Sequence, residues 1–502
     1  MKDQTVKSFR IAESLGVVVR YLEIGVRLDF MKERKLMREG NLELPNTSLC
    51  ERMLSPYNIA VAVANVKRNN GSPGVDGMTV EDFEVYKAEG HFERDKELIL
   101  ARKYKPQPAK RVEIPKDNGG VRLLGIPTVK DRVIQQMMVQ VLQPVFEPTF
   151  SDFSYGFRPH RSAEDAVRQA QIYEAQGYKH VVDLDLSKFF DMVNHDLLMT
   201  LIDRVMPDKD IRRLIYTYLK AGVMIGDVFA ETEQGTPQGG PASPLLSNIY
   251  LTPFDKELES RGLKFVRYAD DCNIFVKSKY SAKRVMNSAI RFLEGPMKLK
   301  VNKEKTEART FAGSAFLGFE FLEARNEENG LCKCRPRAKR RKYFEDRVRE
   351  ILRFNNGIPL YLTMRQLNSF LRGWVNYFSR SNIKSFLERK MQWVRRRLRA
   401  HMWRRWKTAG NRKTKLRKLG VTEKQIEKFS RWSGSHSWRV SMALGKMITN
   451  EMLEKGLNKL DGTTESLLDI SKIWQESHAR KMDTDICVIN GMDQFVMRFM
   501  FD

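Results

Sequence analysis

The stretch FVRYADDCNIFVKS, residues 265–278, consists of two apolar runs on either side of Ala269-Asp270-Asp271. Apolar runs of this length with one polar interruption predict two strands joined by a tight hairpin turn, with two carboxylates at its tip. Aspartate is also favoured in turns for conformational reasons alone, so the stretch by itself does not establish a functional site.

A second stretch, HVVDLDLSKFFDMVNHD (180–196), begins with the alternation of a strand. Val181, Asp183 and Asp185 fall on one face, and the apolar residues between them fall on the other. One aspartate here and a pair on a neighbouring hairpin would supply the oxygen ligands that Mg²⁺ prefers. Two such ions, about 3.5–4 Å apart, can activate an attacking 3′-oxygen and stabilise a leaving pyrophosphate. Phosphoryl transfer needs this alignment and charge neutralisation more than covalent help.

The composition is that of a globular protein with a polyanionic partner. The 502 residues are 42% hydrophobic and 30% charged, which suggests roughly three domains, each with its own core. Lys and Arg number 88 against 62 Asp and Glu, so the formal net charge is +26. Nucleic acid is the first partner to consider, although membrane surfaces and acidic proteins could also neutralise this charge.

Neither a membrane span nor a secretory signal is expected. No run approaches the roughly 20 apolar residues that a spanning helix needs, and the N-terminus lacks a compact apolar core. Five scattered cysteines argue against a disulfide framework. Cys332 and Cys334 lack the further ligands of a zinc site. We therefore expect a cytoplasmic protein, in a bacterial cytoplasm, with no membrane partner.

Changes in pattern along the chain predict five segments. Residues 1–55 indicate a helical extension, and 56–322 alternate short apolar runs with amphipathic stretches, as in an α+β domain. Residues 335–410 are helical and very basic, and 411–460 continue as a basic helical region. The near-neutral segment 461–502 is a C-terminal tail of unknown role.

Nine motifs occur in an order that resembles the group II intron reverse transcriptases, from about residue 54 to 460. They are NNGSPGVDGMT (69–79), KYKPQPAKRVEIPKDNGGVRLLGIPTVKDRVIQ (103–135), SYGFRPHRSAEDAV (154–167), VVDLDLSKFFDMVNHD (181–196), GTPQGGPASPLLSNIYL (235–251), FVRYADDCNIF (265–275), LKVNKEKTE (299–307), AFLGFEF (315–321) and LRGWVNYF (371–378). The resemblance implies an α+β fold of the right-hand polymerase type, with fingers and palm followed by a mostly helical thumb and maturase region.

The resemblance also assigns the catalytic residues. Asp185, Asp270 and Asp271 match the catalytic aspartates, which implies that they hold two Mg²⁺ ions, with Mn²⁺ as a substitute. Asp183 is the alternative to Asp185, but Asp185 stands five residues before Phe190, as the family spacing requires. Lys305 matches the lysine thought to protonate the leaving pyrophosphate.

Further matches concern the nucleotide and the template. Phe190 matches the residue under the sugar, where a bulky ring clashes with a 2′-hydroxyl; the alternative is a core aromatic. Lys116 and Arg122, on either side of a turn, match the pair that reaches over the triphosphate. The remaining matches are Gln238 and Gly239 in the nucleotide and template floor, Tyr268 near the primer end and Arg158 in fingers–palm contacts.

The basic helical half interleaves arginine with tryptophan. A tryptophan stripe usually packs inward, which leaves the arginines facing outward onto phosphate. The candidate nucleic-acid-binding residues are Arg395, Arg396, Arg397, Arg399, Arg404, Arg405 and Lys407.

Together these matches imply an RNA-directed DNA polymerase that also aids intron splicing and retrohoming. Its partners would be an intron RNA template, a DNA or RNA primer and dNTPs, and a homodimer is compatible with them. An HNH endonuclease is not expected, because residues 461–502 offer only His478 and Cys487. Two alternatives stay open: a domesticated relative in phage defence or DNA repair, and an RNA-binding maturase with little polymerase activity.

Overall fold

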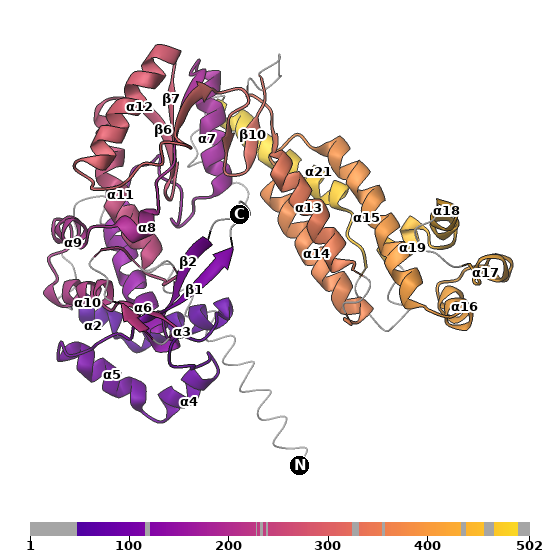
Figure 1. The fold of residues 1–502 in the computed structure, drawn as a ribbon, viewed down its shortest axis with the longest axis horizontal. Coiled ribbons are helices and arrows are strands. Elements are labelled where there is room, and N and C mark those ends of the chain that lie inside the picture. The colour runs from indigo at the N-terminus through magenta and orange to yellow at the C-terminus, as the bar shows by residue number, and fades with distance from the viewer. Residues whose placement is uncertain are drawn as a thin grey trace. The chain divides into compact units, whose positions relative to one another are not determined.

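The computed structural model describes residues 48–115, 121–226, 228–230, 234–236, 239–323, 331–353, 357–432, 438–455 and 466–489. The chain divides into two compact units. The first comprises 1–162, 182–276 and 280–308, and the second comprises 163–181, 277–279 and 309–502. Within the described ranges, the first unit is mixed α/β and the second is mainly helical (Figure 1).

Helices of the first unit surround two small sheets. They are α2 (Leu49–Met53), α3 (Pro56–Asn69), α4 (Asp82–Ala88), α5 (His91–Leu100), α6 (Val129–Phe146), η1 (Glu147–Thr149), α8 (Phe189–Met192), α9 (His195–Asp203), α10 (Lys209–Leu219), α11 (Ser243–Ser260) and α12 (Lys279–Glu294). Thr128 immediately precedes α6, and its side chain accepts a hydrogen bond from the Asp131 backbone N–H and so caps the first turn. Its apolar residues are almost wholly buried, so α6 is a central helix of this unit.

One sheet has the strand order β2-β1-β4-β5. Its strands are β1 (Ala109–Pro115), β2 (Val121–Ile126), β4 (Val223–Ile225) and β5 (Val228–Ala230). Strands β1 and β2 form an antiparallel hairpin, and β4 joins β1 in parallel. This hairpin is the one that the sequence predicts to carry the triphosphate-binding cations.

The other sheet has the order β6-β7-β3-β8 and carries the acidic stretches. Its strands are β3 (His180–Leu184), β6 (Lys264–Tyr268), β7 (Asp271–Val276) and β8 (Glu307–Thr310). Val182 and Phe265 have no exposed surface and help to form the hydrophobic core. Strands β3 and β7 are neighbours, so the two acidic stretches, about 80 residues apart in the sequence, lie side by side in the fold.

The second unit combines a small sheet with a helical bundle. Its elements are α7 (Ala163–Ala175), β9 (Ala315–Phe316), β10 (Phe319–Phe321), β11 (Cys334–Pro336), α13 (Ala338–Ile351), α14 (Leu360–Tyr377), α15 (Lys384–Arg405), α16 (Ala409–Lys418), α17 (Glu423–Phe429), α18 (Trp438–Met447), α19 (Asn450–Lys455) and α21 (Ile470–Ile489). The sheet is antiparallel, with the order β11-β10-β9. The Trp374 ring of α14 packs on Phe344 of α13, with 4.9 Å between ring centroids, and on Phe378 at 4.8 Å.

The C-terminal segment expected at 461–502 packs against the helical bundle where the structure describes it. Helix α21 packs against α14 and α15. The Trp474 indole donates a hydrogen bond to the Ser381 carbonyl at 3.1 Å, and the Asn368 amide donates to the Ser466 carbonyl at 2.7 Å. Residues 466–479 thus pack as part of the helical bundle.

Three further expectations concern the N-terminal extension, the cysteines and membrane-spanning helices. Residues 1–47 of the expected N-terminal extension lie outside the described residues, and the first described helix, α2, begins after Ser48. Cys332 and Cys334 are buried, and the Cys332 carbonyl accepts a hydrogen bond from Gln171. None of the helices in the described ranges combines the length and the apolarity that crossing a bilayer requires.

Candidate active site

The two aspartates of residues 270–271 lie at a hairpin turn, as the sequence predicts. Tyr268 at the end of β6 pairs with Asp271 at the start of β7, so Ala269 and Asp270 alone form the loop. Ala269 has a φ of +58°. Two-residue hairpins require positive φ at their first position, where glycine is usual, and a side chain there costs about 1–2 kcal/mol. The turn is therefore a strained feature that its surroundings must hold.

A buried ion pair holds the turn from below. The Arg267 guanidinium donates to both carboxylate oxygens of Asp255 on α11, at 2.7 and 2.5 Å. It also donates to the Ala269 carbonyl at 2.9 Å and to the Asn248 side chain at 3.0 Å. Burial would lower the pKa of Arg267, but the charge of Asp255 and its hydrogen bonds outweigh this effect and raise it. Arg267 is thus a positioning residue for the turn. Its signal in the sequence is an arginine inside an apolar strand, which must find a buried partner.

The backbone of residues 153–156 runs close to the turn and also holds it in place. Residues 153–155 run beside β6, where the Arg267 N–H donates to the Phe153 carbonyl and the Tyr155 N–H donates to the Arg267 carbonyl. Gly156 follows, and its carbonyl accepts from the Asn248 amide at 2.9 Å. A Cβ on Gly156 would lie 2.9 Å from the Tyr268 carbonyl carbon, 3.1 Å from the Ala269 Cα and closer still to the Ala269 nitrogen. Only glycine fits at this place.

Asp185 follows directly after β3 and is held by Asn302 and Thr306, which lie 117 and 121 residues further along the chain. The Asn302 N–H donates to the Asp185 carbonyl at 2.8 Å, and the Asp185 N–H donates to the Thr306 hydroxyl at 3.2 Å. These bonds bring the Lys305 ammonium to 3.3 Å from an Asp185 carboxylate oxygen. The two side chains are 59% and 41% exposed, so both remain open to a substrate. The structure therefore brings together two residues that the family match assigns to catalysis.

Phe190 lies in the short helix α8, where residues 235 and 236 hold the backbone. The Thr236 N–H donates to the Phe190 carbonyl at 2.7 Å, and a Cβ on Gly235 would lie 3.0 Å from that same oxygen. The Phe190 ring packs edge-on against Phe189, with 5.2 Å between centroids. Phe189 is buried and Phe190 is half-buried, which fits the distinction between a core ring and a gating ring. A neighbouring ion pair, from Arg111 of β1 to Asp191 at 3.5 Å, links the hairpin to α8.

The structure describes the expected triphosphate-binding residues only in part. Lys116 and Gln238 lie outside the described residues, and of Arg122 only the backbone is described, where it pairs with Ile114. Gly239 is exposed, and a Cβ there would lie 2.6 Å from the Gly125 carbonyl oxygen of β2. The small size of Gly239 thus lets its loop lie against the hairpin.

Two expected supporting residues take different places. The Tyr268 ring is half-buried and lies 6.4 Å from the Phe157 ring, between centroids, beside the aspartate turn. Arg158 is buried and pairs with Glu147 at 2.9 Å, and it donates to the Ser151 and Ser154 carbonyls. Arg158 therefore fastens the loop before Gly156 and does not present its guanidinium to a substrate.

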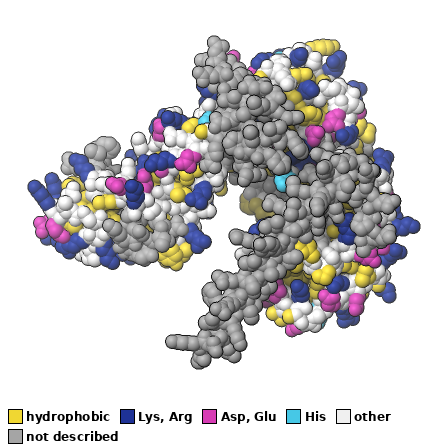
Figure 2. Space-filling view, turned by 180° about the vertical axis from the view of Figure 1, so that it is seen from behind, with side chains coloured by type: hydrophobic (Ala, Val, Ile, Leu, Met, Phe, Trp, Pro, Cys, Tyr) yellow, Lys and Arg dark blue, Asp and Glu magenta, His cyan; other side chains and the backbone are white. Residues whose placement is uncertain are grey.

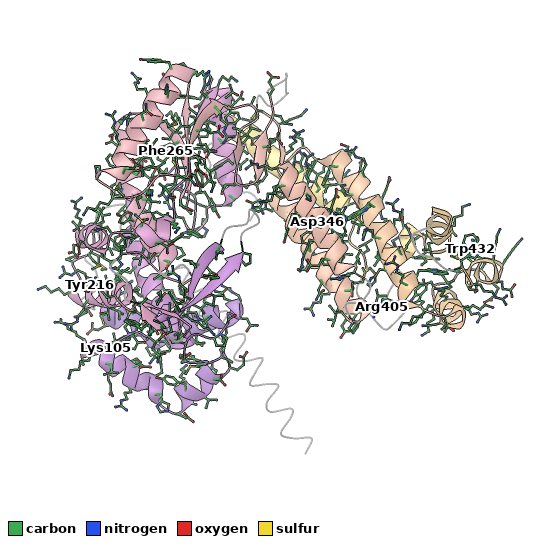
Figure 3. All side chains as sticks on the ribbon, viewed as in Figure 1. Lys105, Tyr216, Phe265, Asp346, Arg405 and Trp432 are labelled. Atoms are coloured by element: carbon green, nitrogen blue, oxygen red, sulfur yellow. The ribbon has the colours of Figure 1, made fainter. Side chains whose placement is uncertain are left out.

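The basic residues expected to face phosphate divide into two groups. Arg395 pairs with Glu454 and Asp469, Arg399 donates to the Ile448 carbonyl at 2.6 Å, and Arg405 donates to the Ile358 carbonyl at 2.6 Å. These three hold the bundle together, and burial lowers the pKa of Arg399 to about 10. The others, Arg396, Arg397, Arg404 and Lys407, are partly or largely exposed. Lys and Arg side chains are scattered over the face seen in Figure 2, and Arg405 is labelled on α15 in Figure 3.

The described carboxylates are suitable ligands for a divalent metal, but they do not form a complete set of metal ligands by themselves. Among the described residues, no group of three or more His, Cys, Asp or Glu side chains gathers tightly enough to hold a metal ion. Asp185 follows β3 and Asp271 begins the neighbouring strand β7, and both offer the hard oxygen ligands that Mg²⁺ takes. Mg²⁺ is usually bound by only one or two carboxylates, and substrate phosphates and water complete the shell. The donor set fits an ion that arrives with its nucleotide.

Comparisons with known proteins agree with this geometry. Residues 114–321 match the reverse transcriptase (RNA-dependent DNA polymerase) family, and residues 341–420 match the group II intron maturase-specific domain. The chain is 34% identical to Protein YkfC of Escherichia coli K12 over 296 residues, covering 51% of this chain and 77% of YkfC. It is also 34% identical to the group II intron-encoded protein LtrA of Lactococcus lactis subsp. cremoris over 278 residues, covering 54% of this chain and 45% of LtrA.

Among solved structures, a chain of the partial Cas6-RT-Cas1--Cas2 complex has 24% sequence identity and a TM-score of 0.33, covering 50% of this chain and 43% of that one.

The assignment of this chain to a family rests on the family matches. The α/β unit with its paired acidic strands defines a nucleotidyl-transferring polymerase, and the basic helical unit follows it in the order of the two matched domains. The chain belongs to the family of group II intron reverse transcriptases and maturases. The predicted fold class is confirmed, and members of this family use divalent metal ions, nucleotides and an RNA template.

Proposed function

We propose that this chain copies RNA into DNA by transferring nucleotides from dNTPs to a primer 3′-hydroxyl. One observation carries the proposal. Asp185 directly follows β3, Asp271 begins the neighbouring strand β7, and the Lys305 ammonium lies 3.3 Å from an Asp185 carboxylate oxygen. Asp185 and Lys305, 120 residues apart in the sequence, are thus adjacent, and Asp271 lies on the strand next to the one that Asp185 follows.

Each residue has a specific task in this proposal. Asp185, Asp270 and Asp271 would hold two Mg²⁺ ions, which supply charge neutralisation for phosphoryl transfer. Lys305, whose ammonium is largely exposed beside Asp185, would give a proton to the departing pyrophosphate. Phe190, held by its backbone at residues 235–236, would exclude a ribose 2′-hydroxyl.

The proposal also includes contacts to the nucleotide, some of them from side chains that the structure does not describe. Lys116 and Arg122 would bind the triphosphate from the β1–β2 hairpin, whose backbone pairing brings Arg122 opposite Ile114. Gln238 and Gly239 would lie under the nucleotide and the template, and the close approach of Gly239 to Gly125 supports a place beside that hairpin.

We also propose that the helical unit binds intron RNA and assists its splicing. Its support is the match of residues 341–420 to the maturase-specific domain, together with exposed arginines on α15. Large structured RNAs are recognised mainly through shape and backbone, which suits distributed guanidinium groups. The net charge of +26 favours binding of the polyanion as a whole.

Primer extension on an RNA template tests the polymerase proposal. The full chain should incorporate dNTPs only when Mg²⁺ or Mn²⁺ is present, and Asp270→Asn should abolish incorporation. Asp196→Asn is the matched control, because Asp196 is an exposed carboxylate in the first turn of α9 and should be dispensable. Full activity of Asp270→Asn would refute the proposal. If the purified chain splices its RNA and never extends a primer, the RNA-binding alternative replaces the polymerase.

A further inference from the structure

Three basic side chains surround one half-buried tryptophan where α13 meets α15. The Trp393 ring has the Arg397 guanidinium 5.3 Å from its centroid, the Arg349 guanidinium at 5.5 Å and the Lys390 ammonium at 5.8 Å. Lys390, Trp393 and Arg397 are spaced three and four residues apart on α15, so they share one face of that helix. Arg349 comes from α13, on which Asp346 is labelled in Figure 3. Arg396 lies next to this face.

The carboxylates beside this cluster neutralise only part of it. Glu345 pairs with Lys390 and with Arg349, and Asp346 pairs with Arg349 at 2.5 Å. Among the described residues, neither Arg396 nor Arg397 has an ion pair or a hydrogen bond to a side chain or carbonyl of the protein. Two guanidinium groups therefore remain without an anion.

The surroundings of Arg397 are unfavourable for its positive charge. Its Nε is buried and has no hydrogen-bond partner among the described atoms. Burial, and after it the charges of Arg349, Arg396 and Arg404, lower the pKa of Arg397. A buried donor without an acceptor costs about 1–3 kcal/mol, so Arg397 carries a local cost in the folded chain.

The opposite side of α15 gives a contrast within the same helix. Arg395 and Arg399 point toward α19 and α21, where carboxylates and carbonyls accept hydrogen bonds from them, although the Arg395 Nε is buried without a partner among the described atoms. An arginine used only for packing would be expected to find such partners. Arg396 and Arg397 instead lie on the side that has a ring for stacking and a surplus of positive charge.

We infer that Arg396, Arg397 and Trp393 form a phosphodiester-binding site for the backbone of a bound nucleic acid. The inference rests on the proposed function, because it deepens the nucleic-acid binding of the helical unit. A guanidinium fork matches two phosphate oxygens, and Trp393 holds the Arg397 fork in a fixed orientation. Such a contact positions the strand and carries no sequence information. It does not depend on the sugar, so RNA and DNA duplexes share it.

Equilibrium binding measured by fluorescence anisotropy tests the site. The probes are labelled RNA and DNA duplexes of equal length, without dNTP, over a range of salt concentrations. The full chain carrying Arg396→Gln and Arg397→Gln should bind both duplexes about tenfold more weakly, and the slope of log affinity against log salt should fall by about two, since each lost phosphate contact removes about 0.9. The control carries Arg365→Gln and Arg372→Gln, two exposed arginines of α14, and should keep the wild-type slope.

A second variant separates charge from geometry. Arg397→Lys keeps the positive charge but loses the fork, so it should retain the salt slope and still bind several-fold more weakly. Thermal unfolding of each variant checks the fold. Equal affinity and slope for the two double variants would overturn the site, and so would a loss confined to the RNA duplex. Asp270→Asn should bind like the wild type. Failure of the site therefore leaves the polymerase proposal standing, and failure of primer extension leaves the binding result unaffected.

Discussion

Replacing Gly156 with alanine tests whether the aspartate turn must be held where the structure places it. The added Cβ would lie 2.9 Å from the Tyr268 carbonyl carbon, whereas ordinary contacts begin at 3.4 Å. All three nearest atoms belong to backbone, so no side chain can swing away. The turn must therefore move by at least the difference, roughly 0.5 Å, and by more because the Ala269 nitrogen is nearer still. A shift of about 1 Å in a reacting group costs about 100-fold in rate.

The assay is single-nucleotide incorporation on an RNA template, with kcat/KM measured for the dNTP. Gly156→Ala should lose about 100-fold, equivalent to about 2.7 kcal/mol of transition-state stabilisation, and overpacking should lower the free energy of unfolding by about 1–3 kcal/mol. Gly373→Ala on α14 is the control, because a Cβ there meets nothing within 4 Å. Alanine in that helix should raise stability by about 0.5–1 kcal/mol and leave activity unchanged. A folded Gly156→Ala enzyme with activity within about threefold of wild type, against the ~100-fold loss expected, would refute the reasoning.

Three further outcomes follow from the same site and core. Asp255→Asn should lower the free energy of unfolding by about 3–5 kcal/mol, because it leaves the Arg267 charge buried without its counter-ion; chemical denaturation measures this, and a change below about 1 kcal/mol contradicts a buried pair. Phe190→Ala should raise ribonucleotide incorporation relative to deoxyribonucleotide, so an unchanged ratio of the two kcat/KM values would remove Phe190 from sugar selection. Burial raises the pKa of the Cys50 thiol from 9.0 to about 11, so between these pH values the folded state keeps a proton that the unfolded state loses. The free energy of unfolding should therefore fall as pH rises from 9 to 11. Cys50→Ala should flatten that fall, and a pH profile identical to that of the wild type would contradict the shift.

The hairpin turn was predictable because its determinants are local. Two apolar runs around Ala269-Asp270-Asp271 predict strand, turn and strand from local sequence, although tertiary contacts hold the strained turn in place. The family match then identified Asp185 and Lys305 as partners, although only the fold shows that the Asn302 and Thr306 bonds bring them together.

The supports of the turn depend on tertiary contacts and were not predicted. Arg267 signals a buried charge, but nothing near it in the sequence identifies Asp255, twelve residues earlier on α11, as its counter-ion. Gly156 belongs to a quoted motif, yet its need for glycine arises only from the approach of the Ala269 backbone.

Charge pattern was a poor guide to which residues face solvent. The run from Arg395 to Lys407 reads as one basic face, but Arg395 and Arg399 point into the bundle because α19 and α21 offer acceptors there. Near-neutral charge set residues 461–502 apart as a C-terminal tail of unknown role. Burial of Ile470 and Trp474 shows that apolar packing, and not charge, determines where α21 belongs.

The central claim is that Asp185 and the aspartates at the β6–β7 turn jointly bind the metal ions that accompany a nucleotide. Its most direct test is diffraction at the manganese absorption edge from the full chain with an RNA template, a non-extendable primer, a dNTP and Mn²⁺. We expect anomalous peaks bridging Asp185, Asp271 and the nucleotide phosphates. Peaks on the phosphates with no contact to these carboxylates would contradict the account.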